Sequence, residues 1–196
     1  MAQHEQRPIV ALIYDFDGTL SPGNMQEYDF IPAVGKSNRE FWEESNETAR
    51  EQDGDPILAY MYRMLHEAKS SGKSLRYEAF VQSGARIGLY DGVREWFSRI
   101  NAYGASKGLE IHHFINSSGL REMIEGTPIA HEFRKIYACS FLYDVDGVPT
   151  GLPSRSTIRI KPSLFSRSTR GSRAFTTATA LTSISRRRSG PFRSVV

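Results

Sequence analysis

The chain has 196 residues, of which 39% are hydrophobic and 24% are charged, values typical of a globular domain with or without a smaller insert. No apolar run approaches the eighteen or so residues of a membrane helix, and the first ten residues lack an apolar signal segment. The single cysteine, Cys139, excludes an intrachain disulfide. Together these features predict a protein of a reducing compartment, most simply the cytoplasm, with no membrane partner.

The net charge of +3 averages two unlike segments of the chain. Residues 1–150 hold all 22 Asp and Glu but only 15 of the 25 Lys and Arg, so this part is acidic. Residues 151–196 hold the other ten Lys and Arg and no acidic residue. The positive net charge of the whole chain therefore comes from residues 151–196, and it does not indicate what residues 1–150 bind.

The first half of the chain predicts one buried strand followed by helices. Residues 8–14 read PIVALIY, a β-branched apolar run typical of a strand that is buried on both faces of a parallel sheet. Further along, Ser37 and Glu40 have the spacing of a capping box. Asp55 precedes Pro56 as an N-cap precedes a proline in the first helical turn. We predict that residues 25–85 form a helical cap inserted into the fold.

The next segments alternate between helix and strand. Val93, Trp96, Phe97 and Ile100 fall on one helical face. Residues 111–119 read IHHFINSSG and predict a second strand closed by a turn of small residues, with a helix opening near Leu120. His112 and His113, which face opposite sides of that strand, are expected to be one core and one surface residue. Residues 135–151 predict one or two strands with a hairpin turn at Asp146 and Gly147.

This order of elements predicts an α/β fold with a Rossmann-like parallel sheet. The predicted core comprises residues 1–24 and 86–150, and the cap comprises residues 25–85. Residues 151–196 lack sustained periodicity and contain many Ser, Thr and Arg residues, so we predict an irregular or disordered basic tail.

Two carboxylates, Asp15 and Asp17, directly follow the first predicted strand. Residues i and i+2 of an extended segment point the same way, so both can face the carboxyl edge of a parallel sheet, where α/β enzymes place their sites. Two such carboxylates stay ionised together most readily around a cation, and hard oxygen ligands favour Mg²⁺. One can also act as a nucleophile and the other as a general acid. The plain alternative is a solvated Asp-Gly turn.

The run IVALIYDFDGTL at residues 9–20 resembles motif I of the haloacid dehalogenase (HAD) superfamily, a group of mostly Mg²⁺-dependent phosphatases. The resemblance implies that Asp15 is a nucleophile that forms an aspartyl-phosphate and that Asp17 is the general acid and base. It also implies that Mg²⁺ binds to the Asp15 carboxylate and the Asp17 backbone carbonyl. Phe16 and Thr19 are expected at the substrate.

Motif II of that superfamily is an apolar strand that ends in a Ser or Thr, whose hydroxyl holds the phosphate. Residues 111–119 match it with Ser117, and Ser118 is the alternative register. A hydroxyl beside the free amides of a helix N-terminus makes an anion site. The runs at 117–124 and 143–151 resemble the phosphoserine-phosphatase-like branch. The resemblance thus implies a small phosphorylated substrate, with Mg²⁺ as the cofactor.

The resemblance ends near residue 150. The superfamily's motif III lysine and its motif IV acidic pair should follow, but residues 151–196 contain one lysine, Lys161, and no acid. Phosphoryl transfer depends on neutralisation of the phosphate charge, so we predict weak Mg²⁺ binding and little or no phosphatase activity.

The abrupt change in composition near residue 150 leaves an alternative to the enzyme open. The chain would then be a non-catalytic, truncated or frame-shifted HAD derivative. Its tail, residues 151–196, would be simply disordered, or it would bind nucleic acid or another anionic partner weakly through its basic residues.

Overall fold

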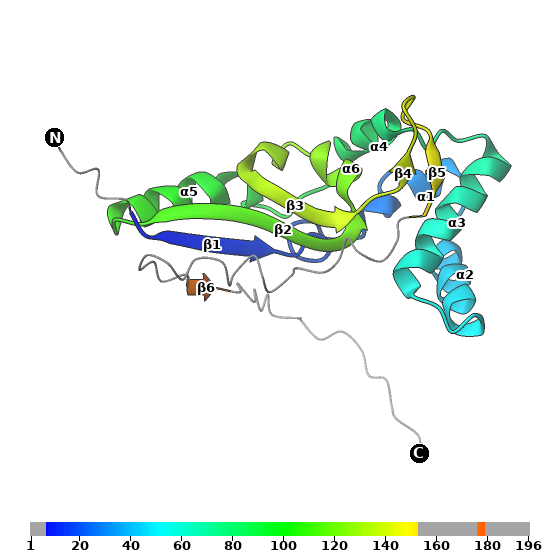
Figure 1. Ribbon diagram of the computed structural model, residues 1–196, viewed down its shortest axis with the longest axis horizontal. Coiled ribbons are helices and arrows are strands. Elements are labelled where there is room, and N and C mark those ends of the chain that lie inside the picture. Colours follow the sequence, from blue (N-terminus) through cyan, green and yellow to red (C-terminus); the bar gives the residue numbers. More distant parts are fainter. Residues whose placement is uncertain (1–6, 153–175, 179–196) are drawn as a thin grey trace, which may run out of the picture.

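The computed structural model describes residues 7–152 and 176–178, and its centre is a parallel β-sheet (Figure 1). The strands are β1 (Ile9–Tyr14), β2 (Glu110–Leu120), β3 (Phe133–Cys139) and β6 (Thr176–Ala178). They lie in the order β3-β2-β1-β6, and every neighbouring pair is parallel. The predicted α/β fold with a parallel sheet is thus confirmed.

Strand β1 is central in this sheet because it pairs with β2 on one side and with β6 on the other. Its side chains contribute to the hydrophobic core, in which Ala11, Leu12 and Tyr14 are buried. Tyr14 pairs with Ile115, so the chain leaves β1 beside the middle of β2. The arrowheads of β1 and β3 in Figure 1 point toward the end of the molecule where α2 and α3 lie.

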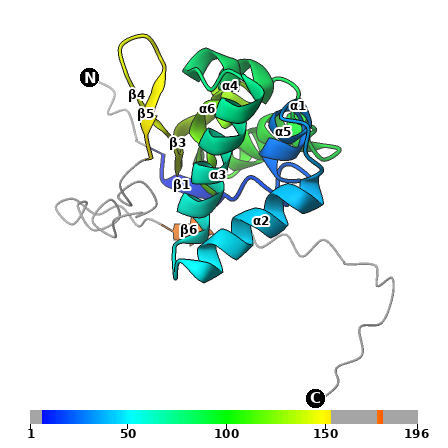
Figure 2. The same ribbon diagram turned by 90° about the vertical axis from the view of Figure 1, so that its right-hand side faces the viewer.

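The region predicted as a cap is helical. Its elements are a 3₁₀ turn η1 (Met25–Glu27), α1 (Phe30–Ala33), α2 (Asn38–Glu51), α3 (Pro56–Ser71) and α4 (Tyr77–Gly84). The capping box at Ser37 is confirmed, and Asp55 caps α3 by accepting the Ile57 amide N–H at 2.8 Å. Helices α2 and α3 pack together (Figure 2). The division at residues 25 and 85 stays a prediction.

The remaining elements lie between the strands of the sheet in the sequence or form a separate hairpin after β3. They are α5 (Val93–Ser106), α6 (Arg121–Glu125), a 3₁₀ turn η2 (Ala130–Glu132), β4 (Leu142–Tyr143) and β5 (Pro149–Gly151). Strands β4 and β5 form the predicted antiparallel hairpin, and Gly147 lies in its turn. Helix α4 packs on α6, so the last helix of the predicted cap contacts the segment that follows β2.

A series of hydrogen bonds links side chains of α5 to side chains of β1 and β2. The Trp96 indole N–H donates to the Tyr14 hydroxyl at 2.9 Å, and that hydroxyl is 3.0 Å from His113 Nδ1. His113 Nε2 lies 3.0 Å from Asn101 Oδ1. Burial lowers the pKa of His113 to about 4, so the ring is neutral at pH 7. His113 is therefore the buried member of the histidine pair, whereas His112 is partly exposed and lies beside Glu110.

The basic tail predicted at residues 151–196 lies outside the described residues, apart from residues 151–152 and strand β6. Lys161 lies outside them as well. In the part of the chain that the structure describes, no helix combines the length and the apolar character needed to cross a bilayer.

Candidate functional site

A tight turn follows β1 and carries the paired carboxylates. The Phe16 carbonyl accepts the amide N–H groups of Thr19, Leu20 and Ser21 at 3.2, 2.8 and 3.1 Å. The Phe16 side chain is fully buried and anchors this turn in the core. Asp15 is exposed, and its Oδ1 accepts the Phe16 amide N–H at 2.7 Å. The turn therefore presents Asp15 to solvent directly at the carboxyl end of the central strand.

Asp17 is less exposed than Asp15, and its carboxylate accepts a hydrogen bond from a backbone amide. Its Oδ1 accepts the Met25 amide N–H at 3.0 Å. Its Oδ2 faces the end of β2, because a methyl group added at Gly119 would lie 3.1 Å from that oxygen. The absence of a side chain at Gly119 thus leaves space for the Met25 side chain and for the Asp17 carboxylate beside the segment that carries Ser117.

The surroundings of Asp17 change its acidity. Burial raises the pKa of its carboxyl from 3.8 to about 7. The Met25 amide opposes this rise, whereas the negative charges of Asp15 and Glu27 add to it. At neutral pH the carboxyl therefore exists in both protonation states, and it can give or take a proton.

The serines at the end of β2 have different environments. Ser117 is buried, and its Oγ accepts the Gly119 amide N–H at 3.0 Å, which leaves its hydroxyl proton free to be donated. Ser118 is exposed. The predicted turn at residues 117–119 is wrong, because β2 continues to Leu120, which pairs with Cys139 of β3. Helix α6 begins only at Arg121, three residues beyond Ser118.

The structure brings most of the predicted site residues to one edge of the sheet. Asp15, Asp17 and Thr19 lie in the turn after β1, and the Asp17 carboxylate lies beside Gly119, two residues after Ser117. The Phe16 side chain belongs to the core, so only its backbone is available at this edge. The substrate and metal roles of these residues stay predictions.

Sequence reasoning missed Tyr60, a buried residue of α3 that borders the same edge. Its hydroxyl donates to the Ser118 carbonyl at 2.7 Å, and its ring meets the Trp42 ring at a centroid distance of 5.9 Å. Burial raises the pKa of Tyr60 well above its ordinary value, and the nearby Asp17 carboxylate contributes to the shift. The contact joins residues 58 positions apart, so no local pattern in the sequence indicates it.

The side chains at this edge offer the oxygen ligands that Mg²⁺ prefers, but only a small number of them. Mg²⁺ is commonly bound by one or two carboxylates, with water and substrate phosphate completing its shell. Asp15 and Asp17 supply two carboxyl groups, and the described residues contain no cluster of three or more His, Cys, Asp or Glu side chains that could hold a metal. Residues 151–196 add no carboxylate side chain. The available donors therefore predict weak metal binding.

Comparison with known proteins finds a relative of uncharacterised function. No family model matches the chain. An uncharacterised protein of Borreliella burgdorferi is 34% identical over 149 residues, which cover 71% of this chain and 52% of that protein. The chain thus spans about half the length of the curated relative that it matches.

Solved structures that match part of this chain include two bacterial proteins. A phosphoserine phosphohydrolase-like protein of Francisella tularensis has 22% identity and a TM-score of 0.48, over 78% of this chain and 67% of the other. A HAD-family hydrolase of Salmonella enterica has 15% identity and a TM-score of 0.49, over 74% of this chain and 45% of the other.

Proposed function

We propose that the chain belongs to the HAD superfamily and that its site is of the phosphomonoester hydrolase type. One observation carries the proposal. Asp15 and Asp17 follow the central parallel strand, and the Asp17 carboxylate faces Gly119, beside Ser117 at the end of the neighbouring strand. A nucleophile, a titratable acid and a hydroxyl donor at one sheet edge are the groups that phosphate transfer to a carboxylate requires.

In this proposal Asp15 attacks the phosphorus of the substrate. Its exposure gives a phosphate group access to the carboxylate. The bond from Asp15 oxygen to phosphorus forms while the bond from phosphorus to the leaving alcohol breaks, which yields an aspartyl-phosphate. Water then attacks that phosphorus and regenerates Asp15.

Asp17 is the proposed proton carrier for both steps. With its pKa raised to about 7, the carboxyl can protonate the leaving alcohol oxygen and then accept a proton from the attacking water. A carboxyl with an ordinary pKa near 4 would be almost wholly ionised at neutral pH and would make a poor acid. The buried position of Asp17 and the charge of Asp15 thus support its role.

The proposed substrate is a small phosphomonoester. The Ser117 hydroxyl would donate to a phosphate oxygen, and Ser118 and Thr19 lie at the same edge as further polar groups. Mg²⁺ would be held by the Asp15 carboxylate and the Asp17 backbone carbonyl, and it would offset the negative charge of the phosphate.

We propose further that turnover by this chain is low. Two carboxyl groups and no assigned lysine leave much of the phosphate charge unbalanced. We therefore expect p-nitrophenyl phosphate hydrolysis at the background rate, even in excess Mg²⁺. Hydrolysis well above background that disappears in Asp15→Asn would contradict the predicted impairment.

Calorimetric titration with Mg²⁺ tests the metal assignment independently of turnover. We expect weak binding by the wild-type chain and its loss in Asp15→Asn. Asp53→Asn is the matched control, because Asp53 is exposed and has a positive φ of 44°, a conformation that asparagine also tolerates. Equal Mg²⁺ affinity in the wild type and Asp15→Asn would refute the assignment of Asp15 as a metal ligand.

The competing proposal is a non-catalytic HAD derivative. It is favoured by the absence of any Asp or Glu after residue 150 and by the small donor set at the sheet edge. Such a protein would retain the carboxylate pair without using it, so Asp15→Asn would alter neither Mg²⁺ binding nor phosphate binding. Its basic residues 151–196 would be the site for an anionic partner.

A further inference from the structure

A buried carboxyl group lies where α6 meets the end of β3. Glu122 is the second residue of α6 and is fully buried. Ser140 follows directly after β3 and is also buried, and its Oγ is hydrogen-bonded to Glu122 Oε1. The Glu122 side chain therefore joins the start of α6 to the chain that leads from β3 into the β4–β5 hairpin.

The Ser140 hydroxyl has three polar neighbours but only one proton. Arg121 Nη2 donates to Ser140 Oγ at 2.9 Å, and the Phe141 carbonyl oxygen lies 3.1 Å from the same Oγ. A carbonyl oxygen can only accept, so the contact with Phe141 requires the Ser140 proton. Ser140 Oγ must then accept from Glu122, which is possible only when that carboxyl group is protonated. All three contacts are satisfied together in this protonation state.

The other oxygen of the carboxyl group also favours the protonated state. Glu122 Oε2 is buried, and within the described residues it has no hydrogen-bond partner. The neighbouring Arg121 guanidinium donates to Ser140, and its Nε lies 3.8 Å from Glu125 Oε1. A buried carboxylate with an unsatisfied oxygen is costly, whereas a neutral carboxyl group leaves only an uncharged oxygen unsatisfied.

The groups that surround Glu122 are mostly neutral or acidic. Burial raises the pKa of Glu122 from 4.5, although the Ser140 hydroxyl opposes the rise. Burial also raises the pKa of Cys139 to about 11, and a hydrogen bond to Glu125 raises the pKa of Tyr77 to about 12, so neither group is charged at neutral pH. The charged and titratable groups that face Glu122 in the described residues are Arg121 and Glu125 of α6, Tyr60 of α3, Tyr77 of α4, Cys139 of β3 and Tyr143 of β4.

We propose that Glu122 carries a proton in the folded protein and acts as a pH-sensitive latch between α6 and residues 140–143. While it is protonated, the carboxyl group donates to Ser140 Oγ and holds the chain after β3 against α6. At higher pH the proton passes to a base in the solvent, and this donation is lost. The contact then opens, because the buried carboxylate gains hydration by reaching water. The latch would operate whether or not the chain hydrolyses phosphate.

The segment held in this way carries the β4–β5 hairpin. The Tyr143 ring meets the Tyr77 ring of α4 at a centroid distance of 5.6 Å, and the Phe141 ring stacks on the Phe80 ring of α4 at 5.7 Å. At the tip of the hairpin, the Gly147 carbonyl accepts the Tyr77 amide N–H at 3.0 Å. The hairpin is therefore attached on the side of α4 and α6.

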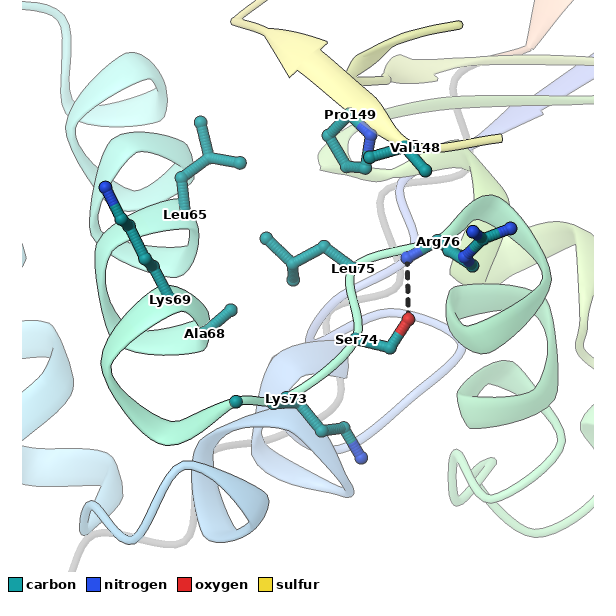
Figure 3. Close-up of a pocket in the computed structure, with 10 residues that line it drawn as sticks. Leu65, Ala68, Lys69, Lys73, Ser74, Leu75, Arg76, Val148 and Pro149 are labelled. Carbon is teal, nitrogen blue, oxygen red and sulfur yellow. Dashed lines mark hydrogen bonds between the residues drawn. The ribbon is translucent and has the colours of Figure 1, made fainter. Parts of the chain in front are cut away.

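Another side of the hairpin borders a pocket rather than packed side chains. Val148 and Pro149 of the hairpin line this pocket together with Leu65 of α3 and Leu75 of the connecting segment (Figure 3). Its volume is about 490 Å³. The hairpin could thus move toward α3 without displacing a packed core. Opening of the contact at Glu122 would therefore allow residues 140–143 to move together with the hairpin.

Carbon NMR of the Glu122 side-chain carboxyl tests its protonation directly. We expect the chemical shift of a protonated carboxyl at about pH 5.5, where an ordinary glutamate, with a pKa near 4.3, is almost wholly ionised. The signal is assigned through the backbone resonances of the wild type, so the measurement does not require a variant that folds. An ionised carboxylate at this pH would overturn the proposal, and so would a carboxyl group that keeps its proton until the chain unfolds.

Hydrogen exchange tests the opening, over the pH range in which NMR shows Glu122 to lose its proton. We expect the amides of residues 140–143 to lose protection by about tenfold or more in the wild type, beyond the intrinsic effect of pH. Glu122→Gln should keep its protection, because glutamine can donate to Ser140 and does not ionise. Glu51→Gln, which changes an exposed glutamate at the end of α2, should behave like the wild type. Equal pH dependence in the wild type and Glu122→Gln would overturn the latch.

Discussion

Replacement of Gly84 by alanine tests how the predicted cap is joined to the rest of the fold. Gly84 ends α4, where this helix crosses α6. A methyl group at this position would lie 2.1 Å from the Met123 carbonyl oxygen and 2.9 Å from Gly126 Cα. Both are backbone atoms, so no side-chain rotation relieves the overlap. The helices would have to move apart.

The cost of that movement outweighs the gain from a better helix former. Overpacking a tight contact costs about 3 kcal/mol at the upper end of its usual range. Alanine is favoured over glycine within a helix by about 1 kcal/mol. The net loss in the free energy of unfolding is therefore about 2 kcal/mol. For a folded part of this size, that loss lowers the unfolding temperature by roughly 4–8 °C.

Urea and thermal unfolding measure this effect, and Gly54→Ala is the matched control. A methyl group at Gly54 would have no neighbour closer than 3.8 Å, and the residue has no positive φ. We expect Gly54→Ala to change the unfolding temperature by less than about 2 °C. An unfolding temperature for Gly84→Ala equal to that of the wild type would refute the close crossing of α4 and α6.

Three further predictions concern buried polar groups. Because the pKa of Asp17 is raised in the folded state, the free energy of unfolding of the wild type falls between about pH 4 and pH 7. Asp17→Asn should therefore raise the free energy of unfolding by roughly 1–3 kcal/mol at pH 8 and by less at pH 4, as measured by urea titrations at both pH values. Tyr60→Phe should cost about 1–2 kcal/mol in urea unfolding, because it leaves the Ser118 carbonyl without its donor, whereas exposed Tyr62→Phe should cost nothing. Cys139 should react slowly with a thiol reagent until the protein is unfolded, because burial raises its pKa to about 11; rapid reaction of the folded chain would contradict its buried position.

The parts of the fold that sequence predicted well are those set by local chemistry. The capping box at Ser37 and the cap at Asp55 require only residues within one helical turn, and both were confirmed. The strand before Asp15 was also predictable, because a β-branched apolar run carries its own signal of burial on both faces. The carboxylate pair follows directly from the end of that strand.

The features that sequence did not predict depend on distant parts of the chain. Residues 117–119 have the composition of a turn, but β2 continues through them to Leu120, which pairs with Cys139 after an irregularity in the β2–β3 pairing that begins beyond Asn116. Strand formation depends on such neighbours more than on intrinsic preference. Tyr60 reaches Ser118 through the placement of α3, and the raised pKa of Asp17 results from its burial beside β2. Neither property could be inferred before the helices were placed against the sheet.

The most direct test of the proposed phosphate site uses beryllofluoride, a phosphoryl-group mimic that bonds to a carboxylate oxygen. Fluorine NMR in excess Mg²⁺ reports its bound form. We predict a bound signal from the wild type and from Asp53→Asn, a weaker one from Ser117→Ala, and none from Asp15→Asn. No bound signal from the wild type, or an equal signal from Asp15→Asn, would contradict the assignment of Asp15 as the phosphate acceptor.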